Sequence, residues 1–542
     1  MNKTLSSHLQ WSWSHTKGYR GALLLYFILE VFAIALSLLF VLWSKQAIDY
    51  AVSGSRANLK PVLILVVASI VLALVLRSLS SWINERTRLR MGMVLQNKMI
   101  EVQMLSLWKV VKDWHSGDIQ VRIHSDCKEV VNMVTYSAIS FLLTIIKLVA
   151  SFGFLWSMDP MLALIIVAIS PLFLFSKIYF RKMRHLSREI KKEESNFGKV
   201  LQENLRLRML IRGMDLLGAR RTKLERNQDT IYDLKLEQLN FSTLTQGGMK
   251  LAINAGYLVT FIWGVYRLQS GQISVGTMTA FLQLVGRIQS PLLALAGFAP
   301  LFIRFRTSLE RLIELAGGVR EPLLRSIKIN DIIALKIQNL SFKYEDYEVI
   351  EGLSMEARVG EPVAIMGSSG KGKTTLIRLL LALLQPQNGG IYLKDAHQTY
   401  RLDSGHRINF AYVPQGNSLF SGTVRENILI TDKNANEERI RHSLWLACAE
   451  FVYDLPEGLD TVVGELGYGL SEGQAQRIAI SRAMMRDSGI WLFDEVTSAL
   501  DKETAERLIG RLLQEGKNKI CLFVTHDLNL AQNWEQRITL EN

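Results

Sequence analysis

The stretch that decides the fold of this 542-residue chain lies at 367–375 and reads Gly367, Ser368, Ser369, Gly370, Lys371, Gly372, Lys373, Thr374 and Thr375. Its form is G-x-x-x-x-G-K-[ST], which Lys373 and Thr374 complete. In such a loop, successive backbone N–H groups face one concavity, and the loop leads into a helix whose N-terminus carries partial positive charge. The stretch therefore predicts a phosphate-binding loop between a strand and a helix.

Four short apolar runs in the same half of the chain each end in a polar residue. Runs this continuous are typical of strands buried on both faces of a parallel sheet. Ligands bind beyond the carboxyl ends of such strands, so the polar residues Gln415, Asp494, Glu495 and His526 are expected to converge on the glycine loop. The runs are Val363–Met366, Phe410–Val413, Ile490–Phe493 and Ile520–Val524.

These residue types suit phosphoryl transfer to water. That reaction needs charge neutralisation on the phosphates, a magnesium ion, an oriented water and a group that accepts its proton. We expect Lys373 to neutralise phosphate charge, Thr374 and Asp494 to hold Mg²⁺, and Glu495 to act as general base. The alternative, an ordinary acidic strand end at 494–495, is disfavoured because hydrophobic residues lead straight into the pair.

The first 305 residues have the pattern of a membrane domain. The chain is 49% hydrophobic, which is high for a soluble enzyme. Six segments stay apolar for about 20 residues, the length that crosses a bilayer core. The first is too long for a cleavable signal, so we expect it to be retained. The six lie near Ala22–Trp43, Pro61–Trp82, Tyr136–Trp156, Leu162–Phe180, Leu251–Tyr266 and Thr277–Phe302.

Basic residues cluster in two connections between these segments, from Arg86 to Lys128 and from Arg181 to Lys235, in a chain of formal net charge +13. Because Lys and Arg concentrate in cytoplasmic loops, we expect the N-terminus and the second domain in the cytosol. The expected location is the plasma membrane, which is the cell inner membrane if the source is a Gram-negative bacterium. The expected surroundings are a lipid bilayer. Nucleic acid is not an expected partner, because no basic motif with interleaved aromatic residues is present.

The domain boundary is expected where the helical pattern gives way to short strands. Turn residues at 114–118 and 213–218 interrupt the two long basic connections and mark candidate coupling regions. The expected domains are an all-α, six-helix transmembrane domain at 1–316, a linker at 317–333 and an α/β P-loop ATPase domain at 334–542.

Two further motifs follow the glycine loop: Phe493-Asp494-Glu495, and the stretch Leu470, Ser471, Glu472, Gly473 and Gln474. With them the chain resembles the ATP-binding cassette (ABC) transporters over essentially its whole length. The membrane half resembles the exporter type, with six helices, long cytosolic extensions and one cassette fused behind. Ser116-Gly117-Asp118 and Gly464-Glu465 resemble exporter segments at the coupling helices. The resemblance implies ATP and Mg²⁺ as cofactors and ATP hydrolysis coupled to transport.

The resemblance also assigns roles to single residues. The signature loop at 470–474 crosses a dimer interface to the partner's γ-phosphate, so one chain is half of an enzyme and its partner is a second half-transporter, identical or different. Tyr344 stacks on adenine, with Tyr347 as the alternative. Gln415 contacts Mg²⁺ and the membrane domain, and His526 is the switch histidine. The D-loop consists of Ser498, Ala499, Leu500 and Asp501.

Two residues depart from the family pattern. Lys371 stands where the family usually has a small residue, and Glu472 replaces a glycine of the signature. One adds positive and the other negative charge, so we hypothesise that they compensate each other across a dimer.

Charged residues inside membrane spans are candidates for function. Glu30, Arg77, Lys147 and Arg287 are of this kind, and Gln283 lies one turn from Arg287 on a polar stripe of the sixth span. We expect Lys147, Gln283 and Arg287 on the substrate path, with a small or amphipathic cargo such as a lipid, a peptide or a drug-like molecule. The alternative is that Glu30 pairs with Lys147 or Arg77 inside the bundle.

The expected activity is therefore export by a dimer. The alternative function is a membrane regulator or an ATP-gated channel that binds nucleotide without pumping, which intact Glu495 and His526 disfavour.

Overall fold

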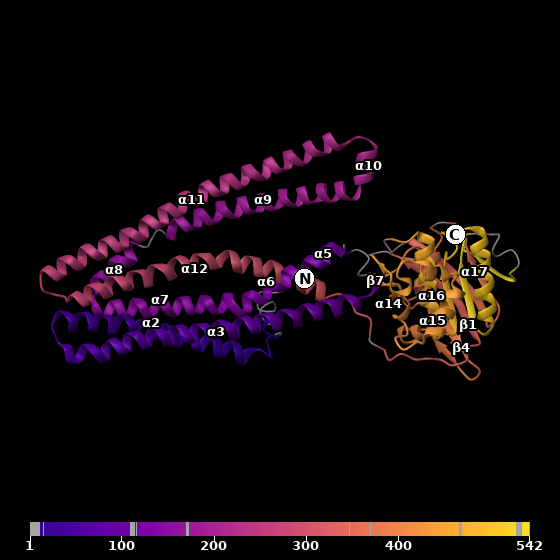
Figure 1. Ribbon diagram of the computed structural model, residues 1–542, viewed down its shortest axis with the longest axis horizontal. Coiled ribbons are helices and arrows are strands. Elements are labelled where there is room, and N and C mark those ends of the chain that lie inside the picture. The colour runs from indigo at the N-terminus through magenta and orange to yellow at the C-terminus, as the bar shows by residue number, and fades with distance from the viewer. Residues whose placement is uncertain are drawn as a thin grey trace. The chain divides into compact units, whose positions relative to one another are not determined.

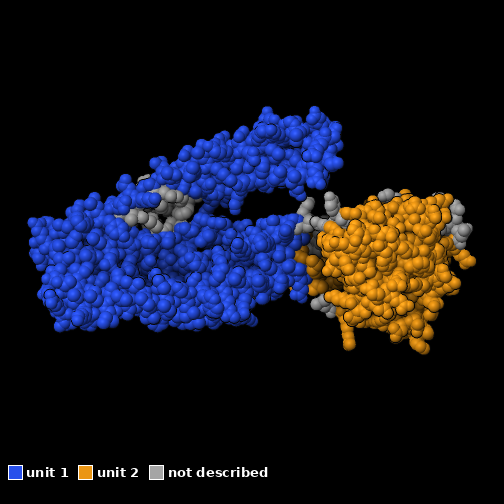
Figure 2. Space-filling view, viewed as in Figure 1, with its two compact units in different colours: residues 1–101, 116–317 blue, residues 102–115, 318–542 orange. Residues whose placement is uncertain are grey.

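The computed structural model divides the chain into two compact units (Figure 2). The first consists of residues 1–101 and 116–317, and the second of residues 102–115 and 318–542. The structure describes residues 11–14, 16–108, 114, 116–169, 173–322, 324–345, 347–368, 370–464, 469–526 and 534–540.

Long helices make up the first unit (Figure 1). Its connecting segments are rich in Leu, Arg, Lys and Glu, all good helix formers, which explains why the helices continue well beyond the apolar runs. Two π-helical turns, at 122–126 and 133–137, separate the short helices that precede α7. In chain order the helices are α2 (Arg20–Val52), α3 (Arg56–Met104), α5 (Ser116–Val121), α6 (Cys127–Asn132), α7 (Ala138–Met158), α8 (Pro160–Ile169), α9 (Phe173–Arg206), α10 (Arg208–Gly213), α11 (Leu217–Gln269) and α12 (Val275–Ala316).

Helices α9 and α11 pack against each other as an antiparallel pair, and α10 connects them (Figure 1). The break between α10 and α11 contains Asp215 at φ 52° and falls within the predicted turn at 213–218. Three ion pairs join α9 to α11. Ion pairs at the surface contribute at most about 1 kcal/mol each, so they support rather than determine the packing of the two helices. They join Lys235 to Glu194 at 2.8 Å, Lys182 to Glu237 at 3.1 Å and Arg220 to Glu203 at 2.7 Å.

Three helices within the described residues are long and apolar enough to cross a membrane: Arg20–Val52, Arg56–Met104 and the run Gly117–Met158. These contain the first three predicted spans. The fourth predicted span falls on α8 and α9, with residues 170–172 outside the described part of the chain, and the last two fall within α11 and α12. The total of six spans therefore remains a prediction.

A buried aspartate fixes the corner between α7 and α8. One carboxylate oxygen of Asp159 accepts the backbone N–H of Leu162 at 3.1 Å, as an N-terminal cap of α8 does. The other oxygen accepts the indole N–H of Trp263 at 3.0 Å and lies 3.5 Å from the Arg267 guanidinium, both on α11. Around this corner the core of the unit contains Val41, Leu155, Leu162, Ala163, Ile166, Ala280, Phe281, Leu284, Val285 and Ile288.

The second unit is built on two sheets. A five-stranded sheet has the order β11-β3-β10-β9-β6, and all of its pairings are parallel. Four of its five strands, β3, β6, β9 and β10, are the four apolar runs, so that part of the sequence prediction is confirmed. The strands are β3 (Val363–Met366), β6 (Phe410–Val413), β9 (Ile490–Asp494), β10 (Ile520–Val524) and β11 (Gln536–Thr539).

The second sheet is antiparallel, with the order β2-β1-β4-β5. It consists of β1 (Ala334–Tyr344), β2 (Tyr347–Arg358), β4 (Asn388–Lys394) and β5 (Thr399–Arg401). Two short strands, β7 (Gly422–Thr423) and β8 (Val462–Val463), pair separately. The helices are α13 (Lys373–Leu380), α14 (Val424–Leu429), α15 (Glu437–Leu446), α16 (Glu472–Met484) and α17 (Lys502–Glu515).

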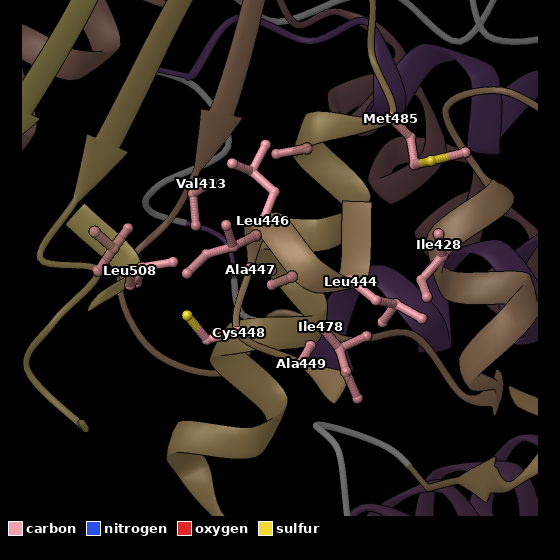
Figure 3. Close-up of a cluster of buried hydrophobic side chains, with 14 of the residues drawn as sticks. Val413, Ile428, Leu444, Leu446, Ala447, Cys448, Ala449, Ile478, Met485 and Leu508 are labelled. Carbon is pink, nitrogen blue, oxygen red and sulfur yellow. The ribbon is translucent and has the colours of Figure 1, made fainter. Parts of the chain in front are cut away.

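Helices α14 to α17 pack around one apolar cluster (Figure 3). Ile428 comes from α14, Leu444 from α15, Ile478 from α16 and Leu508 from α17, and Val413 at the end of β6 joins them. All five side chains are fully or almost fully buried. This cluster attaches the helix that follows the signature loop to the parallel sheet.

Two segments outside the predicted ATPase domain pack with the second unit. The N–H of Leu107 donates to the carbonyl of Val319 at 3.1 Å, and the N–H of Glu321 donates to the carbonyl of Leu105 at 2.7 Å. Ile329 and Ile332, within the predicted linker, are buried in the core around β1 and β3. The predicted linker is therefore largely part of the second unit.

Candidate nucleotide-hydrolysis site

The glycine loop connects β3 to α13, as its sequence predicts. Gly370 and Gly372 have φ angles of 84° and 90°, which favour glycine. A Cβ atom on Gly372 would lie 2.9 Å from the Val349 side chain and 3.0 Å from its carbonyl oxygen, so a larger residue would not fit. Of the predicted loop residues, Ser369 lies outside the described part of the chain.

Lys373 is the first residue of α13, and its ammonium group contacts the glycine loop that precedes the helix. It donates to the carbonyl oxygens of Gly367 at 2.5 Å and Ser368 at 3.3 Å. The next side chain, Thr374, is exposed, whereas Thr375 is buried. The ammonium, the exposed hydroxyl and the N-terminus of an eight-residue helix therefore meet at the mouth of the loop, where a phosphate is favoured.

Glu495 lies at the carboxyl end of β9, and it is contacted by residues that follow β6 and β10, the two strands paired with β9. Its backbone has φ 50°, a left-handed conformation, and its N–H donates to the carbonyl of Val524 at 2.9 Å. The side-chain amide of Gln415 donates to one carboxylate oxygen at 2.6 Å, and Nδ1 of His526 lies 3.4 Å from the other. The structure therefore brings the strand-end residues Gln415, Glu495 and His526 together.

Asp494, the last residue of β9, is buried beside this carboxylate. Burial and then the neighbouring Glu495 charge raise its pKa to about 6, although the Gln415 backbone N–H, the Lys373 ammonium and the Tyr412 hydroxyl act in the opposite direction. Burial, followed by Asp494, raises the pKa of Tyr412 to about 12. The ionised form of Asp494 is therefore unfavourable in this site, and a nearby cation would stabilise it.

The residues expected to hold Mg²⁺ fit that ion. Asp494 offers a carboxylate, Thr374 an exposed hydroxyl, and Gln415 an amide oxygen, since its nitrogen is the atom that donates to Glu495. Oxygen donors of this kind, few in number and supplemented by phosphate, are what Mg²⁺ prefers in proteins.

The signature loop caps α16. The Ser471 hydroxyl accepts the N–H of Gln474 at 3.2 Å, and the Gln474 side chain accepts the N–H of Ser471 at 2.9 Å, a reciprocal capping box. Gly473 is buried against the D-loop: a Cβ atom there would lie 2.6 Å from the Ala499 carbonyl oxygen. The D-loop ends at Asp501, which caps α17 by accepting the N–H of Thr504 at 2.9 Å.

The sequence prediction missed Gln476, which positions Glu495, and it did not foresee that the predicted D-loop residue Ser498 contacts the same group. The buried Gln476 of α16 donates to the carbonyl of Glu495 at 3.0 Å, and the Ser498 hydroxyl donates to the same carbonyl at 2.9 Å. Gln476 lies one turn after Glu472 on the helix, and no motif points to it. These contacts tie the conformation of Glu495 to both the signature helix and the D-loop.

Tyr344 lies at the end of β1, half-buried, with its hydroxyl accepting from Arg378 of α13 at 3.2 Å. Its ring packs edge-on against Phe342, with ring centroids 4.9 Å apart. The alternative, Tyr347, is exposed. The structure therefore attaches Tyr344, but not Tyr347, to the helix that begins at the glycine loop.

Within the first unit, the predicted ion pair of Glu30 with Lys147 or Arg77 is not among the pairs within 4 Å that the described residues form. The carboxylate of Glu30 instead accepts a hydrogen bond from the Ser80 hydroxyl. Gln283 donates to the Ser44 hydroxyl at 3.3 Å, which links α12 to α2.

Two protein families match the chain. Residues 23–292 match the family described as "ABC transporter transmembrane region", and residues 350–498 match "ABC transporter". The chain belongs to the ABC transporters. Its membrane region and its cassette are fused in one polypeptide, the arrangement of an exporter half-transporter, and it is an ATPase coupled to transport across a membrane.

Individual relatives agree with this assignment. The chain is similar to the leukotoxin translocation ATP-binding protein LktB of Mannheimia haemolytica and to that of Bibersteinia trehalosi, each 26% identical over 536 residues, which are 97% of this chain and 75% of the relative. Among solved structures, a bacterial Atm1-family ABC exporter with ATP bound shares the fold, with a TM-score of 0.79 and 21% identity over 96% of this chain and 93% of that one.

Proposed function

We propose that two copies of this chain, or this chain and a similar half-transporter, form an exporter that moves a small or amphipathic molecule across the membrane by alternating access. ATP binding closes the two cassettes on each other, and hydrolysis resets them, so that nucleotide shifts the population of two conformations. The observation that carries the proposal is the carboxylate of Glu495, held between Gln415 and His526.

The side chains take complementary roles in hydrolysis. Glu495 accepts a proton from the attacking water, because its carboxylate is oriented and not fully solvated. Lys373 leaves the loop carbonyls and pairs with the β- and γ-phosphates. Thr374, Gln415 and Asp494 hold Mg²⁺, which when bound neutralises phosphate charge. His526 orients Glu495 and contacts the γ-phosphate.

The dimer supplies the remaining contacts. The signature loop, Leu470 to Gln474, reaches the nucleotide of the partner, and the D-loop lies beside it. In this arrangement Lys371 of one chain and Glu472 of the other approach the same nucleotide, and their opposite charges compensate. The adenine stacks on Tyr344.

A regulator or ATP-gated channel is the competing function. Such a protein needs nucleotide binding but no general base. The positioned Glu495 supports hydrolysis and therefore export.

The test uses the full chain in proteoliposomes with Glu495→Gln. We expect ATP hydrolysis to fall about 10²- to 10⁴-fold, the range for loss of a general base, while ATP binding persists. Glu438→Gln, an exposed acid of α15, is the matched control. Ion conductance that requires ATP and persists in Glu495→Gln would favour the channel, and undiminished hydrolysis would refute the assigned base.

A further inference from the structure

Three cationic side chains lie together in the first unit although they come from three separate helices. Arg77 is on α3, Lys147 on α7 and Arg287 on α12. Arg77 and Arg287 line the same cavity, and the charges of both act on Lys147. All three fall within predicted membrane spans, where charged groups are rare and usually functional.

No acidic side chain among the described residues lies within ion-pair distance of the cluster, although Glu30 contacts Ser80, one turn after Arg77 on α3. None of the three cations takes part in the ion pairs within 4 Å that these residues form. Glu30, the alternative partner considered for Lys147 or Arg77, accepts a hydrogen bond from Ser80. Like charges that lie close together in predicted membrane spans repel one another, so an anion that binds between them would stabilise the arrangement.

A cavity of about 600 Å³ is lined by two of these cations, Arg77 and Arg287, and its size suits a small ligand. Its polar lining consists of Arg77, Arg287 and the serines Ser37, Ser69, Ser78 and Ser81. The rest of the lining is apolar and includes Phe40 and Ile70. The cavity therefore combines cationic and hydroxyl groups with a hydrocarbon surface.

Further polar atoms flank the cations with no hydrogen-bond partner among the described residues. The buried side-chain oxygen of Gln283, one turn before Arg287 on α12, has none, and the buried Ser151 hydroxyl, one turn after Lys147 on α7, has none either. Residues four apart on a helix share a face. Each of these two helices thus presents a cation and a polar group on the same face.

We propose that the cluster of Arg77, Lys147 and Arg287 binds the anionic group of the exported molecule, a phosphate, sulfate or carboxylate, and that the apolar part of the cavity takes its hydrocarbon portion. The proposal rests on the exporter function and specifies its cargo as an amphipathic anion. The cations contribute charge-assisted hydrogen bonds to the anion.

The test measures binding without nucleotide, so that it does not depend on hydrolysis. The full chain in phosphatidylcholine nanodiscs is titrated calorimetrically with dodecyl phosphate, dodecyl maltoside, dodecyltrimethylammonium and inorganic phosphate. Arg287→Gln and Lys147→Gln should each weaken dodecyl phosphate binding about tenfold or more, the loss expected for one charge-assisted hydrogen bond. Arg287→Lys and Lys147→Arg should stay within about threefold, which separates lost charge from lost folding.

Lys60→Gln is the control, because this exposed cation lies on the same helix as Arg77 but about 25 Å along it. If inorganic phosphate competes with dodecyl phosphate, the site is supported and a free anion is sufficient for binding. If dodecyl phosphate binds and inorganic phosphate does not, the site is also supported, and binding requires the alkyl chain. Equal binding of the neutral or cationic amphiphile, or unaltered binding by both Gln variants, would overturn the proposal. Glu495→Gln should bind dodecyl phosphate like the native chain, so failure of the exporter function and failure of the anion site give different results.

Discussion

The close approach of the signature loop to the D-loop predicts that Gly473→Ala impairs both stability and hydrolysis. The added Cβ would lie 2.6 Å from the Ala499 carbonyl oxygen, whereas real Cβ atoms essentially never approach closer than 3.0 Å, so backbone must move by about 0.4 Å. Overpacking of this kind costs about 1–3 kcal/mol. Alanine recovers about 0.5–1 kcal/mol in a helix, which leaves a net loss of roughly 1 kcal/mol and at most about 2.5 kcal/mol.

The matched control is Gly510→Ala in α17, where the new Cβ would meet nothing within 4 Å. This control should be neutral or slightly stabilising. Thermal unfolding and ATP hydrolysis of the full chain in proteoliposomes measure both effects. Because displacement of the D-loop misplaces catalytic groups, we expect Gly473→Ala to reduce hydrolysis about tenfold. If Gly473→Ala behaved like Gly510→Ala in both measurements, the steric argument would be refuted.

Two further predictions concern charged side chains of the second unit. The pKa of Asp494 rises from 3.8 to about 6 on folding. The protonated carboxyl group therefore stabilises the folded state below about pH 4, and this stabilisation is lost as the pH rises through about 6. Asp494→Asn should therefore stabilise the Mg²⁺-free protein by about 3 kcal/mol at pH 8 but only about half as much at pH 5. Thermal unfolding measures this effect, and a stability difference between the variant and the native chain that does not change with pH would contradict the prediction. Arg407 donates to both carboxylate oxygens of Glu321 at 2.7 and 2.6 Å and to two backbone carbonyls, so Arg407→Lys should destabilise the unit by about 1–2 kcal/mol in denaturant unfolding, with exposed Arg401→Lys as the unaffected control.

The sequence was sufficient for four strands of the parallel sheet because they are buried and read as continuous apolar runs, whereas the edge strand β11, which alternates half-buried and exposed positions, was not predicted. Val363–Met366 and Ile490–Phe493 could be assigned in this way, and the polar residues after each strand led directly to Glu495. The four-stranded antiparallel sheet was not predicted. Its strands β1 and β2 alternate buried and exposed positions with register shifts, which weakens a period-two pattern.

Long-range contacts could not be predicted from local patterns. The association of residues 102–115 with the second unit depends on hydrogen bonds such as that between Leu107 and Val319, which are far apart in the sequence. Similarly, Arg77 and Arg287 were recognised individually as charges in apolar segments, but only the fold brings them together. Gln476 lacks any motif, and its role follows only from the position of its helix beside β9.

Helix α16 carries two functions at neighbouring turns. Its first residues belong to the signature loop, which in the proposed dimer contacts the nucleotide of the partner. One turn later Gln476 donates to the carbonyl of Glu495, the proposed general base for this chain's own nucleotide. A helix turn is rigid, so a shift caused at one end is felt at the other. In the proposed dimer we therefore expect the two ATP sites to be cooperative, so that damage to one cassette slows hydrolysis in its intact neighbour.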